Sequence, residues 1–448
     1  MADCDQFYNL RDLRTSQYSG KNDFSSRPVH IEIDNSTASS APGQLSLLAL
    51  ANQLVRVHRR ITFAIGNPSQ PIQIDIPFSK STLGDTLLST TQHIDPCGDF
   101  RLRDQPEKRA ISIGLGYQVS KGYDWYIGAE ESIGLLMKSP VAFSHSQGTL
   151  RGAAVASCLG SAAIFRTMLG LETTPRRLSA WNYAEGEDAL AGPETVQPLD
   201  VGKVLMVGAG AVAASLVYWL TAFGILGDWT IVDKDAVELH NINRGLLFTA
   251  SDAGWPDGEP RKKAKILSEL IPGSRWDSSW YHESRVTEEP YDVILGLANE
   301  HDVRHFIASR NNPVTLHATT GENWMSQLHR HIVALDDCIW CRVGQVNKSK
   351  FLCSTVPIEA PDETKVDAAL PFLSAASGLM LATALQRLQL GELVIQDRND
   401  WRWDFDSTHR MVSSSFRQCR SDCTRIHRAE IRREINKESR WQYLDVRK

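Results

Sequence analysis

The sequence predicts an α/β protein whose central unit is a doubly wound, largely parallel sheet, and two observations support this prediction. In the first, an apolar strand at Val204–Val207 turns through Gly208-Ala209-Gly210 into a helix of small residues, and a second strand ends at Asp233. Such glycines let a phosphate approach the helix N-terminus, and the acid can hold ribose hydroxyls. In the second, strands and helices alternate from residue 201 to residue 343, which favours a parallel sheet.

The composition is that of an ordinary globular protein of two or three domains. The 448 residues carry a net charge of −5, with 23% charged and 42% hydrophobic residues and no fixed-period repeat. No basic run indicates a nucleic-acid partner, and no apolar stretch of about 18 residues indicates a signal peptide or membrane span. We therefore expect a cytoplasmic chain whose eight cysteines are thiols or metal ligands rather than disulfides.

Residues 1–195 are expected to form the first domain, which ends near an acidic segment with two prolines and two glycines at 185–200. Its Ala-rich segment at 140–170 predicts a helix buried on several faces. The other elements expected there are a loop at 35–43, a helix at 45–56, and strands at 61–65 and 111–115.

Residues 200–343 are expected to form the second domain and residues 344–448 the third. The second adds a basic helix at 261–270 and strands at 291–297, 314–318 and 331–335, and the third has a loop at 359–366, a helix at 370–388 and Trp-rich strands near Trp401.

The nucleotide-binding run continues beyond Asp233 in a way that a dehydrogenase does not need. Asp235, Asn241 and Arg244 follow it. An amide and a guanidinium at these positions suit an enzyme that promotes attack on the α-phosphate of ATP, because cations stabilise the charge that develops on phosphorus.

The stretch from Val204 to Arg244 resembles the adenylation domain of the ThiF/MoeB and ubiquitin-activating enzyme superfamily, which carries Gly-x-Gly-Gly-x-Gly and then Asp-x-Asp-x-Val-Glu-x-x-Asn-x-x-Arg. The resemblance implies a Rossmann-like adenylation domain that binds ATP and Mg²⁺. It also implies a lysine on the next helix, for which Lys263 is our first choice and Lys262 the alternative. The resemblance assigns catalytic roles to Arg244 and Lys263. The nucleotide-binding residues it implies are Gly208, Gly210, Asp233, Asp235, Asn241, Arg244, Lys263 and Asn299.

The chain departs from the family pattern at two places. Ala211 and Ala213 stand in the glycine turn, and Asn299 replaces the aspartate that helps to hold Mg²⁺ in the family. An asparagine can offer Mg²⁺ its carbonyl oxygen but adds no negative charge. Either Glu300 supplies the carboxylate or the site is weaker, so a catalytically inactive scaffold is one alternative.

Two close cysteine pairs predict a metal site. Cys338 and Cys341 form a CxxC pair after an expected strand, and Cys419 and Cys423 form a CxxxC pair downstream. Four such thiolates suit tetrahedral Zn²⁺, whereas one CxxC pair alone could be a redox pair. The resemblance implies a structural zinc that joins the C-terminal strands to the adenylation domain.

Cys353 stands in a polar segment without a nearby partner cysteine. In ubiquitin-activating enzymes the thioester cysteine follows the first zinc pair, so the resemblance implies that Cys353 is the catalytic acceptor. A thiolate there could attack an acyl-adenylate, because AMP is a good leaving group.

The first 195 residues resemble the same superfamily weakly and carry no Gly-x-Gly turn, acid-Asn-Arg run or cysteine pair. The expectation is an inactive adenylation-like domain, which would give an intramolecular pseudo-dimer where relatives pair two subunits; a homodimer is the alternative. In relatives an arginine near the partner's N-terminus reaches ATP, and Arg11 or Arg14 could take that part.

The resemblance therefore implies an enzyme that adenylates the C-terminal carboxylate of a ubiquitin-like β-grasp protein, forms a thioester on Cys353 and passes the acyl group to a conjugating enzyme. The layout resembles bacterial ubiquitin-like conjugation systems linked to antiviral defence. The alternatives are a sulfur-carrier adenylyltransferase, whose product is a thiocarboxylate, and the inactive scaffold. No nucleic-acid or membrane partner is expected.

Overall fold

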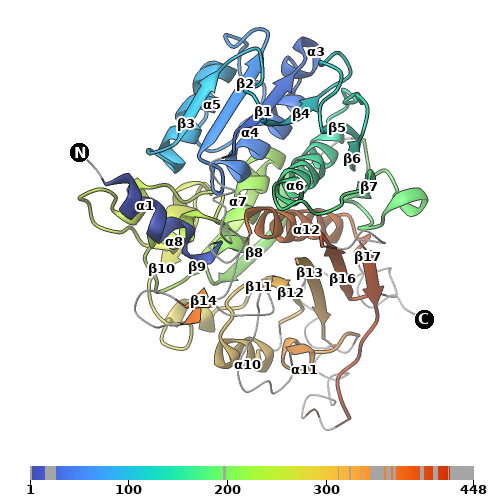
Figure 1. Cartoon of the computed structure of the whole chain (residues 1–448). Helices are drawn as coiled ribbons and strands as arrows, with labels where there is room; N and C mark the ends of the chain where they lie inside the picture. The colour runs from blue at the N-terminus through green and yellow to red at the C-terminus, as the bar shows by residue number, and fades with distance from the viewer. Residues whose placement is uncertain are drawn as a thin grey trace.

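A computed structural model of the chain shows two α/β sheets that face each other across a layer of helices (Figure 1). The described residues are 3–15, 27–194, 198–310, 312–321, 324–333, 335–343, 358–359, 365–366, 370–393, 398–406, 412–421 and 423.

The first sheet has the strand order β3-β2-β1-β4-β5-β6-β7. Its first five strands in this order are parallel, and β6 and β7 continue the sheet in antiparallel pairing. The strands are β1 Val29–Ile33, β2 Arg60–Ile65, β3 Asp99–Leu102, β4 Ile111–Leu115, β5 Trp125–Glu130, β6 Ile133–Met137 and β7 Arg176–Ser179.

The second sheet has the order β10-β9-β8-β11-β12-β13-β16-β17. Again the first five are parallel and the rest are antiparallel. The strands are β8 Leu199–Val207, β9 Ile225–Val232, β10 Arg275–Asp277, β11 Val293–Gly296, β12 Val314–Gly321, β13 Met325–Ile332, β16 Asp400–Asp404 and β17 Val412–Ser415, and β14 Ile358–Glu359 pairs separately with β15 Lys365–Val366.

The two sheets repeat one topology. Counted within each half, both begin with the order third-second-first-fourth-fifth and then add antiparallel strands. Each half also places one long helix after its first strand and another after its sixth. The predicted α/β, doubly wound fold is therefore confirmed, and the chain contains two copies of it.

Four of these helices form the layer between the sheets: α4 Ala41–Leu54 and α6 Thr149–Met168 from the first half, and α7 Ala211–Phe223 and α12 Pro371–Gln389 from the second. α12 lies very close to α7, since a Cβ added at Gly378 would be 2.6 Å from the backbone nitrogen of Leu216. The indole of Trp219 donates a hydrogen bond to the carbonyl of Ala375 (2.8 Å). Small residues on these helices thus allow backbone-to-backbone packing that larger ones would prevent.

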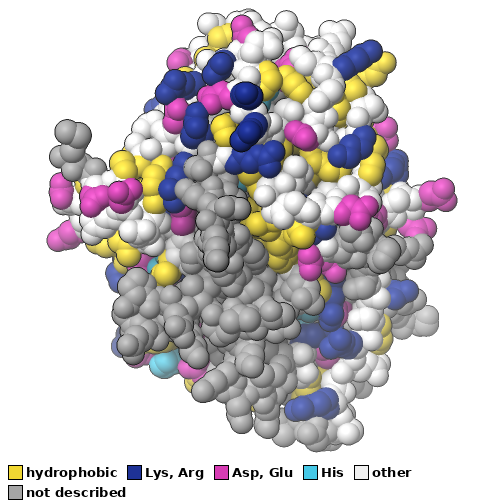
Figure 2. All heavy atoms as spheres, in the orientation of Figure 1, with side chains coloured by type: hydrophobic (Ala, Val, Ile, Leu, Met, Phe, Trp, Pro, Cys, Tyr) yellow, Lys and Arg dark blue, Asp and Glu magenta, His cyan; other side chains and the backbone are white. Residues whose placement is uncertain are grey.

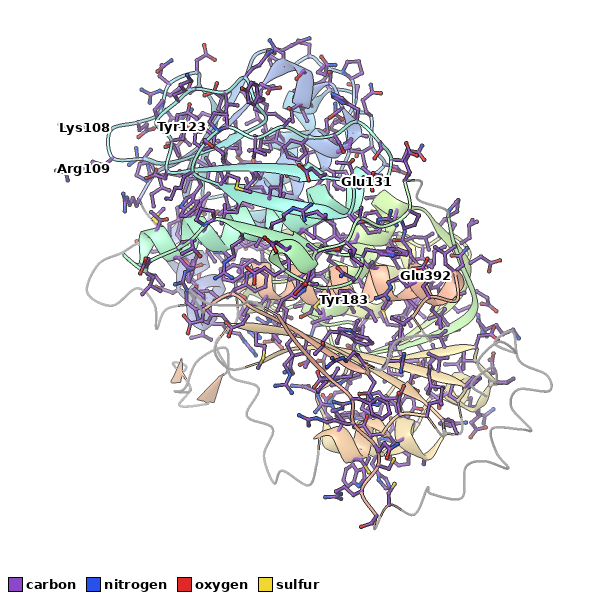
Figure 3. The ribbon with its side chains drawn as sticks, turned by 90° about the vertical axis from the view of Figure 1, so that its right-hand side faces the viewer. Lys108, Arg109, Tyr123, Glu131, Tyr183 and Glu392 are labelled. Atoms are coloured by element: carbon purple, nitrogen blue, oxygen red, sulfur yellow. A yellow bond between two sulfur atoms is a disulfide. The ribbon has the colours of Figure 1, made fainter. Side chains whose placement is uncertain are left out.

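The two halves share one continuous hydrophobic core. Tyr183, labelled in Figure 3, follows β7 and donates its hydroxyl to the carbonyl of Met380 in α12 (3.1 Å). Its ring also packs against Trp401 and Trp403 of the second sheet. The halves therefore fold against each other as one body.

Shorter helices complete the described structure, and none of its helices is long and apolar enough to span a membrane. They are α1 Cys4–Arg11, α3 Asn35–Ala38, α5 Leu83–Ile94, α8 Leu239–Ile242, α9 Lys263–Glu269, α10 His301–Ser309 and α11 Ile339–Val343, with 3₁₀ turns η1 Asp12–Arg14, η3 Gly186–Asp188, η4 Ser251–Ala253 and η5 Arg285–Glu288.

Figure 2 shows Lys and Arg side chains gathered on the upper part of one face, with Asp and Glu among them. Within the first sheet, Arg60 of β2 pairs with Glu107 at 2.6 Å, and Arg101 of β3 pairs with Asp99. These exposed arginines are compensated locally.

The loop expected at 35–43 is a correction, because two helices occupy most of it. The Asp34 carboxylate accepts a hydrogen bond from the N–H of Thr37 (2.7 Å) and caps α3. The Ser40 hydroxyl accepts one from Gly43 (3.1 Å) and caps α4. Polar residues that read as a loop are here helix caps. The loop expected at 359–366 likewise contains parts of β14 and β15.

The expectation of no disulfides is also wrong, since Cys4 and Cys97 are bonded. The buried guanidinium of Arg11 binds the carboxylate of Asp95, which holds α1 against the end of α5. That contact brings together two cysteines 93 positions apart, a proximity that spacing along the sequence does not reveal.

His58, which follows α4, makes stability depend on pH. It is fully buried, and neither ring nitrogen has a hydrogen-bond partner among the described residues. Burial, followed by the charge of Arg11, lowers the pKa of His58 to about 3. Below its ordinary pKa of 6.5 the unfolded histidine binds a proton that the folded one does not, so the unfolded state gains stability as pH falls.

We predict that His58→Leu flattens the pH dependence of stability. In wild type, this residue should remove about 1.4 kcal/mol of unfolding free energy per pH unit as pH falls below 6.5. Urea unfolding at about pH 7 and about pH 5 measures the slope. His145→Leu, at an exposed position in the same half, is the control. Equal slopes for wild type and His58→Leu would contradict the prediction.

Candidate active site

A cleft of about 460 Å³ opens where β8, β9, β11 and β12 end. All the residues that the sequence assigned to nucleotide binding line this one cleft: Gly208, Gly210, Asp233, Asp235, Asn241, Arg244, Lys263 and Asn299. The carboxyl edge of a parallel sheet is where α/β proteins bind ligands.

The glycine turn leaves room for an anion at the N-terminus of α7. Gly208 has φ +95°, and a Cβ there would lie 2.6 Å from the nitrogen of Ala298. Gly210 is the N-cap of α7, and a Cβ there would meet nothing within 4 Å. The turn therefore needs glycine at its first position for close packing, and its second position faces open space where the N–H groups of α7 can meet a phosphate.

Asp233 is fastened to the glycine turn. One oxygen of its carboxylate accepts a hydrogen bond from the N–H of Ala209 (2.6 Å), and the other accepts one from Asp235 (2.8 Å). Burial raises the pKa of Asp233, and these two N–H groups lower it. The carboxylate is thus held at the cleft wall, where its remaining lone pairs can accept hydrogen bonds from ribose hydroxyls.

The side chain of Asn241 accepts one hydrogen bond and, within the part of the chain that the structure describes, donates none. Its side-chain carbonyl accepts a hydrogen bond from the N–H of Glu238 (3.1 Å), which fixes the start of α8. The side chain is buried yet lines the cleft. Its amide NH₂ therefore remains as the group that can donate to a ligand.

The cations of the cleft surround a neutral histidine. Burial, and then the charges of Arg244, Arg14 and Lys263, lower the pKa of His240 to about 3. The Arg244 guanidinium donates to the carbonyl of His240 (2.6 Å). A concentration of positive charge that suppresses protonation of its neighbour suits a polyanion such as a triphosphate.

The structure distinguishes the cations at the start of the expected basic helix, which begins at Lys263 as α9. Lys263 is mostly buried, and its Nζ lies 3.2 Å from the carboxylate of Asp235 in the cleft. Lys262 instead donates to the carbonyl of Lys234 (2.7 Å), and Arg261 pairs with acids outside the cleft. Geometry thus favours the first-choice lysine.

Oxygen donors for Mg²⁺ are present in the cleft. Asn299 is exposed and Glu300 is half-buried, and both line it. Glu300 is the N-cap of α10 but makes no side-chain capping bond, so its carboxylate is not used by the helix. With Asp235 these residues fit the hard oxygen donors that Mg²⁺ prefers.

The two N-terminal arginines considered for ATP binding, Arg11 and Arg14, lie in different surroundings. Arg14 lines the cleft, whereas Arg11 is fully buried and bound to Asp95. His317, Trp280 and Ser374 also line the cleft, although the sequence did not predict them as site residues. His317 could have been predicted, because it lies on β12 near the carboxyl edge of the sheet. Trp280, whose ring centre lies 3.2 Å from the Lys234 ammonium, could not, because no sequence pattern marks it.

The equivalent turn of the first half is closed by an acid. Asp34 follows β1 as Gly208 follows β8. Its carboxylate accepts from the N–H groups of Thr37 (2.7 Å) and Gln118 (2.9 Å). A Cβ at Gly116, which follows β4, would lie 2.2 Å from that carboxylate. A protein carboxylate therefore fills the turn of the first half, whereas the corresponding turn of the second half faces open space at Gly210.

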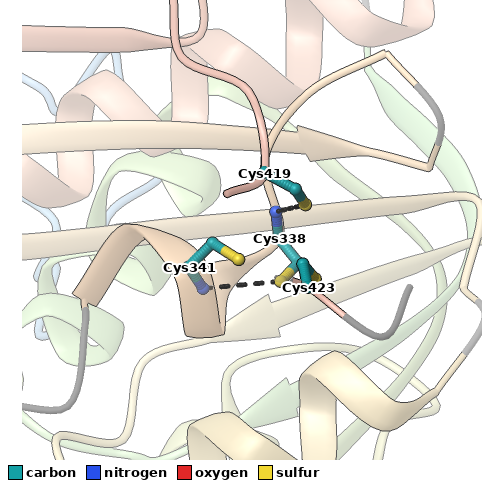
Figure 4. Close-up of side chains that lie close together, drawn as sticks. All are labelled: Cys338, Cys341, Cys419 and Cys423. Carbon is teal, nitrogen blue, oxygen red and sulfur yellow. Dashed lines mark hydrogen bonds between the residues drawn. The ribbon is translucent and has the colours of Figure 1, made fainter. Parts of the chain in front are cut away.

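The four predicted metal-binding cysteines are together (Figure 4). Their sulfur atoms lie within 4.8 Å of one another, although Cys338 and Cys341 are at α11 and Cys419 and Cys423 follow β17. Burial raises the pKa of the Cys341 thiol to about 11. Four close thiolates repel one another unless a divalent cation neutralises them, so this donor set fits Zn²⁺.

Cys353, the predicted acceptor, lies outside the described residues. Its segment belongs to the connection between β13 and α12, which also carries Cys338 and Cys341. The first half joins its corresponding elements, β6 and α6, through residues 138–148, a shorter connection.

The similarity of this chain to known proteins lies mainly in its second half. The ThiF family model matches residues 187–421, slightly more than half of the chain. An uncharacterized protein of Sinorhizobium fredii, y4jF, is 25% identical over 50% of this chain and 43% of its own length. A sulfur carrier protein adenylyltransferase of Thermus thermophilus is 27% identical, covering 26% of this chain and 43% of the relative.

A SAMP-activating enzyme E1 of Haloferax volcanii is 30% identical, covering 25% of this chain and 36% of the relative. This chain thus matches less than half the length of these relatives. A crystal structure of Escherichia coli MccB with ATP aligns with a TM-score of 0.37 at 14% identity, covering 50% of this chain and 65% of that one.

We predict that the protein contains about one zinc ion per chain, because four thiolates suit tetrahedral coordination. Cys419→Ser should lower the zinc content and the thermal midpoint together, as it removes a ligand that links the chain after β17 to α11. Elemental analysis and thermal unfolding measure both. Cys158→Ala, at a buried cysteine in α6, should leave the zinc content unchanged. Full zinc content in Cys419→Ser would contradict this site.

Proposed function

Because the chain belongs to the ThiF family of adenylyltransferases, which is related to E1 enzymes and to sulfur-carrier activators, we propose that it uses ATP to activate the C-terminal carboxylate of a ubiquitin-like β-grasp protein. One observation carries this proposal. The glycine turn, Asp233, Arg244 and Lys263 all line a single cleft, although they come from separate elements of the second half.

In the proposed reaction, a carboxylate oxygen of the carrier attacks the α-phosphorus of ATP. The bond from that phosphorus to the β-phosphate oxygen breaks, so an acyl-adenylate forms and pyrophosphate leaves. Asp233 holds the ribose, and Arg244 and Lys263 stabilise negative charge that grows on the phosphates. Mg²⁺, held by Asn299, Glu300 or Asp235, would supply further charge neutralisation when bound.

The adenylate then needs an acceptor, and we assign Cys353 to this step. Its thiolate attacks the acyl carbon, AMP leaves with the bonding electron pair, and a thioester forms. A thiol of a conjugating enzyme would then take over the acyl group. A sulfur-carrier activator is the second candidate, and the name of the Thermus thermophilus relative supports it; it shares the adenylation step but ends in a thiocarboxylate.

The rest of the chain has supporting parts in this proposal. Residues 1–195 act as an inactive partner domain, a role supported by the Asp34 carboxylate that fills the turn corresponding to the glycine turn, and residues 200–343 carry the adenylation site. Residues 344–448 add Cys353 and the zinc-binding C-terminal region. Cytoplasmic location, a role in antiviral conjugation and the pseudo-dimer in place of a homodimer belong to the same proposal.

We predict that Arg244→Ala and Lys263→Ala each weaken binding of ATP·Mg²⁺ at least about tenfold, because each removes a charge-assisted contact to phosphate. Isothermal titration measures the affinity. Lys262→Ala and Arg261→Ala are matched controls at the two positions just before the same helix, because their side chains bind elsewhere. If the two controls weaken binding as much as Lys263→Ala, the assignment of the lysine is wrong.

We also predict that Cys353→Ala separates the two candidate outcomes. The variant should retain carrier-dependent ATP–pyrophosphate exchange, because adenylation precedes the thiol step. It should lose the adduct with the carrier that reducing agents cleave, as judged by non-reducing electrophoresis. A thiocarboxylate formed from a persulfide donor, without any such adduct in wild type, would favour the sulfur-carrier reaction. Exchange that stays at background with the cognate carrier would favour the inactive scaffold.

A further inference from the structure

One buried arginine of the first half binds a loop of the second half. Arg56 follows α4 and is fully buried. Its guanidinium donates hydrogen bonds to the carbonyls of Ile242, Leu246 (2.7 Å) and Phe248 (3.0 Å). Its Nε donates to the side chain of Asn52 (3.0 Å). The guanidinium therefore binds three carbonyls in one short segment, residues 242–248, which is the end of α8 and the loop that follows it.

The chemistry of this contact distinguishes Arg56 from the other arginine buried nearby. Arg11 binds the carboxylates of Asp12 and Asp95, so its charge is compensated by direct ion pairs. Among the described residues, every acceptor of a hydrogen bond from Arg56 is neutral. Burial accordingly lowers the pKa of Arg56 to about 9. A buried cation without a bonded carboxylate is destabilising unless dipoles replace its water, and here backbone carbonyls of the loop do so.

This segment lies next to two predicted nucleotide-binding residues. Asn241 directly precedes it, and Arg244 lies within residues 242–248. Both side chains line the cleft. The carbonyls that bind Arg56 flank Arg244 on either side along the chain, so the backbone that carries this guanidinium is anchored at both ends from across the interface.

Other contacts from the first half reach the same segment. The side-chain amide of Asn52 donates to the carbonyl of Leu246 (3.1 Å). The carbonyl of His93, in α5, accepts from the N–H of Ala250 (3.1 Å). The loop is thus held by the first half at several points, with Arg56 at the centre of the hydrogen bonds.

We propose that Arg56 is a positioning residue for the ATP site: by binding the carbonyls of residues 242, 246 and 248, it sets the backbone that presents Asn241 and Arg244 to the triphosphate. This role rests on the proposed function. A misplacement of about 1 Å at such residues weakens catalysis strongly. In this role Arg56 lets the first half contribute to the site although its own side chain does not contact the nucleotide.

The test compares Arg56→Lys and Arg56→Met with wild type. Lysine keeps the charge but has one point of attachment instead of a planar fork, and methionine keeps much of the volume without any donor. Arg151→Lys is the matched control: this arginine is also buried in the first half and donates to a backbone carbonyl, that of Pro193. It does not line the cleft.

Three measurements are made on the full chain. Hydrogen–deuterium exchange of peptides covering residues 242–248 reports on the loop, titration with ATP·Mg²⁺ reports on affinity, and thermal unfolding reports on stability. We expect the Arg56 variants to exchange faster in this loop and to bind ATP·Mg²⁺ about tenfold more weakly. The lysine variant should lie between methionine and wild type. Arg151→Lys should lose thermal stability at most, with affinity and loop exchange as in wild type.

The outcomes separate the two ideas. A wild-type protein that binds no ATP would refute the proposed function and, with it, this role for Arg56. A wild type that binds ATP, with Arg56 variants of unchanged affinity, would overturn the positioning role alone, and so would unchanged exchange in the loop. If Arg56→Met does not fold, Arg56→Lys and Asn52→Ala, which removes one bond to the same loop, decide the question.

Discussion

The close packing of four helices between two sheets is the contact on which the rest of the molecule depends. Each sheet has an apolar face that must be covered, and here each half covers the other. The approach of α12 to α7 requires Gly378 and small neighbours, and the Ala-rich α6 occupies the corresponding place in the first half. The core is continuous across both halves. Removing either half would therefore expose the apolar inner face of the other to water.

This packing also explains where the cleft lies. The second half supplies the glycine turn and Asp233 through its own strand ends, in the way of other α/β proteins. The part of the cleft near Arg244 is different, because Arg14 comes from the first half and the loop behind Arg244 is held by Arg56. In the proposed function, the nucleoside would therefore be bound by the second half alone, and the phosphates would be bound with help from both halves.

The same division explains what the sequence could predict. Contiguous features were predictable: the turn at Gly208 and Gly210, the acid Asp233 and the cysteine pairs all have a short spacing that is set by one strand, one helix or the geometry of a candidate metal site. Lys263 could not be separated from Lys262 by spacing, since their directions depend on Asp235 and on the carbonyl of Lys234. The Cys4–Cys97 bond and the role of Asp34 depend on residues far apart in sequence, and no pattern along one chain reports such proximity.

Both copies of the fold are on one polypeptide, so the two surfaces that meet at the interface need not have the same residues. In a symmetric dimer each surface patch must pair with its own copy, so any buried cation would occur twice. Here α4 is followed by Arg56, whereas the corresponding helix α7 ends at Phe223 and is followed by Gly224. The two sides of the interface therefore differ, so that one can support the loop of the other. Under the proposed function, each chain would hold one nucleotide site, without the coupling between equivalent sites that a symmetric dimer permits.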